Sequence, residues 1–330
     1  MCSAPTWGVV ATIKAPARDI LDFAAHHLDL GAHRVHVYLD APDARAEAAL
    51  RAHPRCRVIV CDDAYWRHRR KGRRPEAHQP RQSLNATHCL NRRPDVDWLA
   101  HIDVDEFLWP EVPLPAQLAS LPLDCLSARV RPIEALAPDP DDPPPEGVRW
   151  FRSCARHKGA RAEETAAIYP TFGAHLNGGF LSHVAGKVFV RTGQPGTSLR
   201  IHNAFRGKDM DANPPELVAA RLCHLHAPNW EDWRARLRYR HAAGAYRRDI
   251  KPAGEGALAI HDLLAQIEAE GGETGLRAFF TEVCTATPSL RARLKAHGHL
   301  HAIALDLDAK RARHFPDAGR DPGLAIMPPP

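Results

Sequence analysis

Three acidic residues follow an apolar stretch at about one third of the chain. Residues 101–107 read HIDVDEF, so Asp103, Asp105 and Glu106 come directly after the apolar run 98–102. If the strand continues, Asp103 and Asp105 point to the same side. Two carboxylates at that spacing repel by about 3 kcal/mol at an effective dielectric constant near 20. A divalent cation would remove this repulsion, and Mg²⁺ or Mn²⁺ is commonly held by one or two carboxylates plus substrate phosphates. The pattern predicts a metal-bound diphosphate; the alternative is an acidic turn.

The residues before this motif alternate between strand-like and helix-like segments. The predicted strands cover residues 7–13, 34–39, 57–61 and 98–102, and the predicted helices cover 17–30, 43–53 and 76–90. This alternation predicts an α/β fold with a mostly parallel sheet flanked by helices. Ligands of such sheets bind at the carboxyl ends of the strands. We therefore expect Lys14, Asp40, Asp62 and Asp103 near one edge of the sheet.

The alternation loosens after Pro110. Residues 138–147 form a proline-rich acidic loop that is typical of an insertion. Further segments predict strands at 186–191 and 199–202, helices at 229–245 and 258–270, and two more helices before a proline-ended tail. We expect one domain over residues 1–245 and a helical C-terminal extension with a tail over residues 246–330.

Composition narrows the class of protein. The chain has 330 residues, 44% hydrophobic and 25% charged, which is ordinary for a globular protein and excludes disordered and fibrous classes. No apolar run reaches the roughly 20 residues of a membrane helix, and no secretory signal is expected. Eight scattered cysteines without a CxxC pair indicate reduced thiols, as in the cytoplasm. The P-loop, dinucleotide and serine-hydrolase motifs are missing from the sequence.

Four segments, taken in order, resemble one family of enzymes. They read DILDFAAHHLDLGAHRVHVYLDAPDA, WLAHIDVDEFLWP, HVAGKVFVRTG followed by RIHNAF, and CHLHAPNWEDW, and they span residues 7–235. Together they resemble GT-A fold glycosyltransferases of the family 2-like group with a DxDEF motif, related to family 92. The chain differs from that pattern at Asp22, where Glu is common, and at Leu225 and Pro228, where Tyr and Lys are usual.

The resemblance implies roles for particular residues. Asp105 would bind the metal directly, and Asp103 would contact the metal through water or the donor ribose. Asp40 would contact the nucleoside. His224 would complete the metal site, with His226 as the nearby alternative. The metal would be Mn²⁺ or Mg²⁺, and an imidazole ligand would favour Mn²⁺.

Other residues are candidates for donor binding. Lys187 and Arg191 are four apart on a predicted strand, so both would face one side and contact an anionic donor; the alternative is two solvated charges on a sheet edge. Lys14, at the first strand end, and His202 are further donor-binding candidates.

Transfer to a hydroxyl needs a general base, and a carboxylate is usual in an inverting displacement. The candidates are Glu106, Asp209 and Asp211. Glu106 would face away from Asp103 and Asp105 if the strand persisted.

Six of the eight residues at positions 67–74 are Arg or Lys. This basic run follows a predicted strand, so it could attract the donor diphosphate or an anionic acceptor. A solvated loop and a nucleic-acid patch are the alternatives. Tyr65 and Trp66 beside it are a weak stacking platform, and the net charge of +5 is too small to indicate nucleic acid alone.

The sequence thus predicts a metal-dependent, inverting hexosyl transferase that moves a sugar from a nucleotide-diphosphate donor to a glycan or lipid-linked acceptor, such as a bacterial surface glycan. A nucleotidyltransferase and a nucleic-acid-binding protein are the alternatives, although no nucleic-acid partner is expected. We expect a cytoplasmic protein, with weak peripheral contact at the inner membrane face through its basic surface.

Overall fold

The computed structural model describes residues 4–69, 72–92, 94–242 and 257–319, which form two compact units. The first unit comprises Met1–Arg131, Gly186–Leu222 and Asp306–Pro330, and the second comprises Pro132–Ala185 and Cys223–Leu305. Each unit is therefore assembled from separate stretches of chain. The predicted domain boundary at residues 245 and 246 lies outside the described residues.

The first unit contains a sheet whose strands follow the predicted order closely. Its strands are β1 (Trp7–Ile13), β2 (Arg34–Leu39), β3 (Cys56–Val60), β4 (Trp98–His101), β5 (Glu106–Pro110), β8 (Lys187–Arg191), β9 (Thr197–Leu199), β10 (Ala204–Arg206) and β11 (Asp209–Met210). Strands β6 (Ser127–Ala135) and β12 (Glu216–His224) each begin in this unit and end in the other. Strands β3, β2, β1 and β4 pair in parallel in that order. Strand β8 pairs antiparallel to β4 and to β6, and β9–β11 form a small antiparallel sheet.

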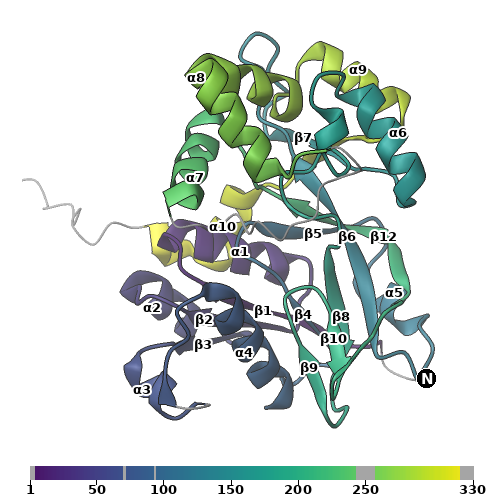
Figure 1. Ribbon diagram of the computed structural model, residues 1–330. Coiled ribbons are helices and arrows are strands. Elements are labelled where there is room, and N and C mark those ends of the chain that lie inside the picture. The colour runs from purple at the N-terminus through teal and green to yellow at the C-terminus, as the bar shows by residue number, and fades with distance from the viewer. Residues whose placement is uncertain (1–3, 70–71, 93, 243–256, 320–330) are drawn as a thin grey trace, which may run out of the picture. The chain divides into compact units, whose positions relative to one another are not determined.

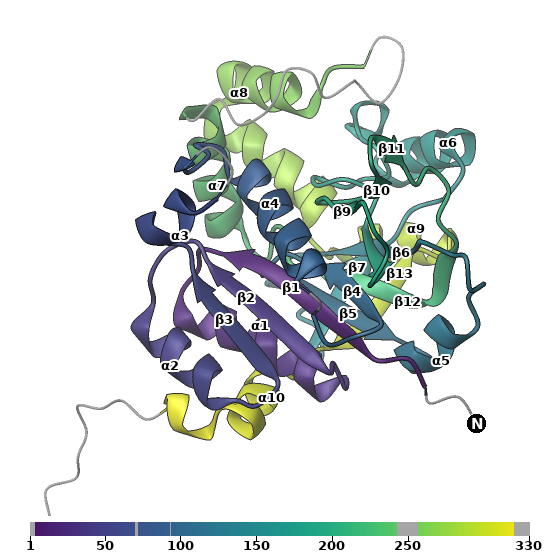
Figure 2. The same cartoon turned by 90° about the horizontal axis from the view of Figure 1, so that it is seen from below.

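The helices of the first unit cover both faces of this sheet. They are α1 (Ala17–Asp29), α2 (Ala44–Ala52), α3 (Asp63–Arg67), α4 (His78–Asn91), α5 (Leu114–Ala119) and α10 (Leu307–His314), followed by a 3₁₀ turn, η3 (Pro316–Gly319). Side chains alternate along β1, so Val9 packs with Phe23 of α1 while Val10 packs with Ala86 of α4. Figure 2 shows α1 and α2 on one face of β1–β3, and α3 and α4 on the other. The predicted α/β class is confirmed, with the first four strands paired in parallel, an arrangement consistent with a GT-A-like fold.

The second unit is mainly helical. It contains β7 (Val148–Arg152), β13 (Leu300–Ala304), α6 (Lys158–Ile168), the 3₁₀ turn η2 (Gly173–His175), α7 (Trp230–Ala242), α8 (Ile260–Cys284) and α9 (Pro288–Ala296) (Figure 1). Strand β7 pairs antiparallel with β13 and with the end of β6. The helix predicted at 258–270 is the first part of α8, which is broken at Gly272, where φ is +57°. Within the described residues, every helix is too short or too polar to span a bilayer.

A buried ion pair lies in the core of the second unit. Arg152 donates to a carboxylate oxygen of Glu134 at 2.5 Å, and both side chains are 1% exposed. Glu134 also accepts the backbone N–H groups of Leu181 and Ser182 at 3.1 and 3.0 Å, while Arg152 donates to the carbonyl of Val283. Burial alone would raise the pKa of Glu134, but the Arg152 charge, assisted by nearby imidazoles, lowers it to about 2. The pair thus joins β6 and β7 to α8 and the loop at 181–182.

Replacing Arg152 with Met is expected to lower the free energy of unfolding by about 3–5 kcal/mol, because Glu134 would remain as an unpaired buried charge. The depressed pKa means that Glu134 contributes stability above pH 4.5, its ordinary pKa, and that this contribution is lost as the pH falls towards 2. Urea unfolding followed by circular dichroism measures the loss. The Arg152→Met/Glu134→Gln double variant should recover part of it, and a single variant within about 1 kcal/mol of the parent would contradict the assignment.

Candidate active site

The carboxyl ends of the parallel strands lie side by side, as the strand order predicted. The N–H of Asp40 donates to the carbonyl of Ile13 at 2.8 Å, and the N–H of Cys61 donates to the carbonyl of Leu39 at 2.8 Å. On the other side of β1, the N–H of Ile102 donates to the carbonyl of Val10 at 3.1 Å. The residues that follow β1, β2, β3 and β4 therefore share one edge of the sheet, and Asp40 and Asp103 both lie there.

The acidic motif after β4 is a tight turn. The N–H of Glu106 donates to the carbonyl of Asp103 at 3.0 Å, and the N–H of Asp103 donates to Oε2 of Glu106 at 2.9 Å. The strand therefore does not continue through the motif. The prediction that Asp103 and Asp105 point to the same side required a continued strand, so that reason no longer applies. The Glu106 side chain points back to Asp103 instead of away from it, because the chain reverses. Asp105 is half-buried at the third position of the turn.

Lys187, the first residue of β8, supplies a buried cation to this turn. Its Nζ lies 2.6 Å from Oδ2 of Asp103 and 3.2 Å from Oε2 of Glu106, and its side chain is 1% exposed. Burial would lower the pKa of Lys187, but the Asp103 and Glu106 carboxylates raise it above the ordinary lysine value. The lysine is therefore charged and fixes both carboxylates. We name Asp103, Asp105, Glu106 and Lys187 the DVDE cluster.

His101, the last residue of β4, lies beneath the DVDE cluster. Its Nε2 is 4.0 Å from Oδ1 of Asp103, and the side chain is buried. Burial first, and then the Lys187 charge, lower the pKa of His101 to about 4, although Asp103 acts in the opposite direction. The imidazole is therefore neutral at pH 7 and adds no second positive charge beside Lys187.

Gln82 of α4 is a residue that the sequence analysis missed. Its Nε2 donates to Oδ1 of Asp103 at 2.5 Å, so Asp103 is held by a helix on one side and by β8 on the other. Gln82 and Asn85 are both on the buried face of α4. Polar side chains on a buried helix face are unusual because they need partners there. Gln82 and Asn85 are three residues apart on the predicted helix, and this spacing could have indicated a polar site.

The DVDE cluster fits a divalent cation in chemistry and charge. Three carboxylates and one ammonium give it a formal charge of −2. Carboxylate oxygens suit Mg²⁺ and Mn²⁺, which commonly take one or two protein carboxylates and complete their shell with water and phosphate. The described residues contain no group of three or more His, Cys, Asp or Glu side chains placed to hold a metal, so these three carboxylates do not form a complete metal site by themselves. Asp103 accepts from Gln82 and Lys187.

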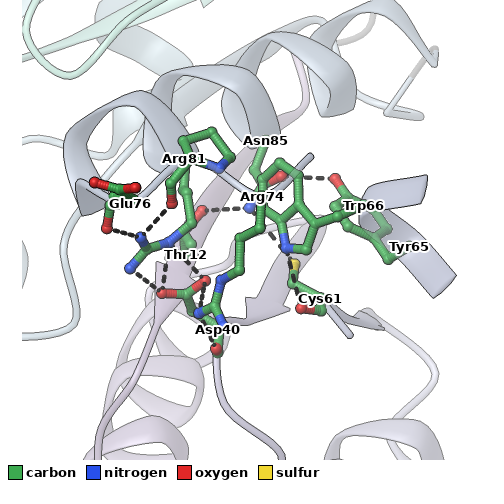
Figure 3. Close-up of polar contacts among 10 residues, drawn as sticks. Thr12, Asp40, Cys61, Tyr65, Trp66, Arg74, Glu76, Arg81 and Asn85 are labelled. Atoms are coloured by element: carbon green, nitrogen blue, oxygen red, sulfur yellow. Dashed lines mark hydrogen bonds and ion pairs between the residues drawn. The ribbon is translucent and has the colours of Figure 1, made fainter. Parts of the chain in front are cut away.

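Asp40 lies at the same edge and is paired with two arginines (Figure 3). Arg81 of α4 donates from Nε and Nη2 to the carboxylate at 2.7–2.9 Å. Arg74 donates to Oδ1 at 3.0 Å and to the Asp40 carbonyl at 2.8 Å. Arg74 is the last residue of the basic run 67–74, so Asp40 ties the end of that run to the sheet edge. The predicted contact of Asp40 with a nucleoside would be made by a carboxylate already fixed by these guanidinium groups.

A second polar network stands between α3, α4 and the strand ends, as Figure 3 also shows. The Tyr65 hydroxyl donates to Oδ1 of Asn85 at 2.6 Å, and Nδ2 of Asn85 donates to the Thr12 hydroxyl at 3.1 Å. The Trp66 indole N–H donates to the carbonyl of Cys61 at 3.1 Å. Tyr65 and Trp66, considered above as a stacking platform, are thus anchored to the sheet.

The structure separates the other predicted donor-binding residues. Lys14 is exposed after β1. Arg191 lies at the opposite end of β8 from Lys187: it is paired in register with Trp98, and its guanidinium lies 4.3 Å from the centre of the Trp98 ring. His202 hydrogen-bonds through Nδ1 to the carbonyl of Gly186 at 3.1 Å, so it lies beside the start of β8. Lys187, by contrast, forms ion pairs with Asp103 and Glu106.

The candidate bases and the third predicted metal ligand are placed as follows. Asp209 is exposed in β11, and Asp211 accepts from the Ser127 hydroxyl at 2.6 Å. Glu106 is 3% exposed and already accepts from two donors, an arrangement that suits a positioning role better than proton removal. His224 ends β12 in the second unit, where its ring centre is 5.0 Å from that of His226.

Comparison with known proteins found similarity to solved structures. No family model matches the chain, and no curated protein matches it either. Among solved structures, the apo form of the WbbM bifunctional glycosyltransferase is similar over 57% of this chain, with 13% identity and a TM-score of 0.29. HddC from Yersinia pseudotuberculosis is similar over 42% of the chain, with 11% identity and a TM-score of 0.27. The aligned regions span 31% of the WbbM chain and 65% of the HddC chain.

Proposed function

We propose that this protein is a metal-dependent glycosyltransferase that uses a nucleotide-diphosphate sugar as donor. The observation that carries the proposal is the DVDE cluster: three carboxylates in a turn at the carboxyl end of a parallel strand, which together with the Lys187 ammonium have a net charge of −2. That edge is where α/β sheets bind their ligands. The resemblance of the segments around the motif to DxDEF glycosyltransferases supports the same assignment.

Each residue of the cluster would have a different role. Asp105 would bind Mn²⁺ or Mg²⁺, which as a Lewis acid neutralises the charge that develops on a departing diphosphate. Asp103, held by Gln82 and Lys187, would orient a water ligand of the metal or the donor ribose. Lys187 keeps the carboxylates in place before the donor arrives, so no rearrangement is needed at the moment of transfer.

The finer parts of the proposal concern the reaction partners. We propose an inverting transfer to a hydroxyl of a glycan or lipid-linked acceptor, with Asp209 or Asp211 as the general base. Asp40 would orient the nucleoside together with Arg74 and Arg81. A nucleotidyltransferase would use a similar cluster but would release pyrophosphate, whereas a glycosyltransferase releases a nucleoside diphosphate.

A thermal-shift screen of nucleoside diphosphates with and without Mn²⁺ tests this function. One nucleoside diphosphate should raise the melting temperature by several degrees only when Mn²⁺ is present, because the two bind as a unit. A match to one base would also identify the donor. If no nucleoside diphosphate and metal pair shifts the transition, or if the shift is equal with EDTA, the proposed function is wrong.

A further inference from the structure

A pocket lies in the first unit, between α3, α4 and β9. Its volume is about 450 Å³, within the usual range for small-molecule sites. Its lining includes Tyr65, Trp66, Arg69, His88, Arg92 and Arg200. No residue of the DVDE cluster is among the lining residues, although Tyr65, Trp66 and Asn85 of the polar network described above also line the pocket.

The pocket extends along α4, in the direction away from the DVDE cluster. Gln82 contacts Asp103, whereas the pocket is lined by residues that follow Gln82 on α4, as far as its end. An α-helix rises about 1.5 Å per residue, which places Arg92 about 15 Å along the axis from Gln82. On the other side, α4 is joined to β9 through Thr87, whose hydroxyl donates to the carbonyl of Leu199 at 3.0 Å. The walls are therefore parts of one packed unit.

The charge of the lining is uniformly positive. Three guanidinium groups line the pocket, and no Asp or Glu is among its lining residues. Arg69 lies 4.4 Å from the centre of the Tyr65 ring, and Arg200 lies 3.9 Å from the centre of the Phe205 ring. Within the part of the chain that the structure describes, Nε of Arg69 is a buried donor with no hydrogen-bond partner.

His88 stands between the arginines and adds a neutral polar group. Its Nδ1 hydrogen-bonds the Tyr38 hydroxyl at 2.7 Å. Burial first, and then the charges of Arg69 and Arg92, lower its pKa to about 4. Arg69, His88 and Arg92 all line the same pocket. An anion in that space would be attracted by both guanidinium groups.

We propose that this pocket binds a phosphorylated sugar, with its phosphate group among Arg69, Arg92 and Arg200. Guanidinium groups bind phosphate by charge-assisted, often paired hydrogen bonds. The pocket is larger than a phosphate alone, and the polar side chains of Ser83, Asn91 and Ser198 line the remaining space. Hydroxyl and amide groups of this kind hydrogen-bond sugar hydroxyls. The inference rests on the pocket and not on the function proposed for the DVDE cluster.

Isothermal titration calorimetry with glucose 1-phosphate and with inorganic phosphate, in EDTA, tests the site on the full chain. Both probes should bind the parent protein, because the arginines need no metal. Arg92→Ala and Arg200→Ala should each weaken binding at least tenfold, since each removes one charge-assisted contact. Arg67→Ala is the matched control: Arg67 is an exposed arginine of the same basic run that does not line the pocket, so affinity should stay within twofold.

The outcomes separate this site from the candidate active site. Asp105→Ala should leave binding of both probes in EDTA unchanged, even if it removes transferase activity. Equal weakening in Arg67→Ala and Arg92→Ala would mean diffuse attraction by the basic run and would overturn the proposal. Failure of both probes to bind the parent protein would overturn it as well. Tighter binding of glucose 1-phosphate than of inorganic phosphate would support a sugar phosphate over a simple anion, and equal binding would overturn that part.

Discussion

Replacing Lys187 with Met is expected to lower the free energy of unfolding of the first unit by about 3–5 kcal/mol, because Asp103 and Glu106 would face each other without a cation. Both carboxylates lie within 3.2 Å of the same ammonium, so its removal would affect both. Urea unfolding measures the loss. The exposed Lys208→Met variant is the control and should change stability by less than about 0.5 kcal/mol.

The pH dependence of the Lys187→Met variant gives a second readout. In the parent protein the raised pKa of Lys187 means that its stabilisation is present at neutral pH and is lost only as the pH rises through that raised pKa. In the variant, the crowded carboxylates should share a proton, which raises their pKa in the folded state. The folded state then binds more protons than the unfolded state, so the loss of stability should be smaller near about pH 5 than near about pH 8.

A double variant separates electrostatics from packing at this position. Lys187→Met/Glu106→Gln removes one of the two facing carboxylates and should recover about half of the lost stability. If the double variant is as unstable as Lys187→Met alone, or if Lys187→Met is as stable as the parent at every pH, the buried charge of Lys187 is not what holds the turn together.

Replacing Asp105 with Ala is expected to reduce sugar transfer at least about 100-fold, because loss of a metal ligand removes several kcal/mol of charge stabilisation in the transition state. Release of nucleoside diphosphate from a panel of nucleotide sugars with Mn²⁺ measures this. The side chain is half-buried at the corner of a turn, so the melting temperature should change by only a few degrees.

The control for Asp105→Ala is Asp63→Ala, which removes an exposed carboxylate at the start of α3 and should keep full activity. An Asp105→Ala variant that transfers sugar at the parental rate in the presence of EDTA would contradict the metal role. A variant that is inactive but also unfolded would be replaced by Asp105→Asn, which keeps the size of the side chain, and the same loss of activity is expected from it.

The positions of the predicted site residues followed from the sequence only as far as the strand ends. The apolar runs at β1, β2 and β4 are short, separated by helical segments, and each is followed by a polar residue, so Asp40 and Asp103 could be placed at one edge. The turn at Asp103–Glu106 could not be read from the pattern, because an alternation of apolar and acidic residues fits a continued strand as well as a reversal.

Contacts between residues far apart in the sequence could not be predicted from the sequence alone. Lys187 is 84 residues from Asp103, and Arg81 is 41 residues from Asp40. The spacing of Lys187 and Arg191 predicted that both would contact an anion. The two ends of β8 instead lie at opposite ends of β4, since the strands run antiparallel and Trp98 pairs with Arg191. Strand direction is set by the connection and the packing around it, which residue spacing does not reveal.

By itself, the sequence determined the alternation of strands and helices, the faces that these elements bury, and the acidic motif at a strand end. Local periodicity carries that information because each residue's preference depends mainly on its neighbours in the chain. The tertiary structure alone decided that β8 pairs with β4 in the register that brings Lys187 to the DVDE cluster. A slip of one residue would turn Lys187 to the other face of the sheet, and the cluster would lose its cation.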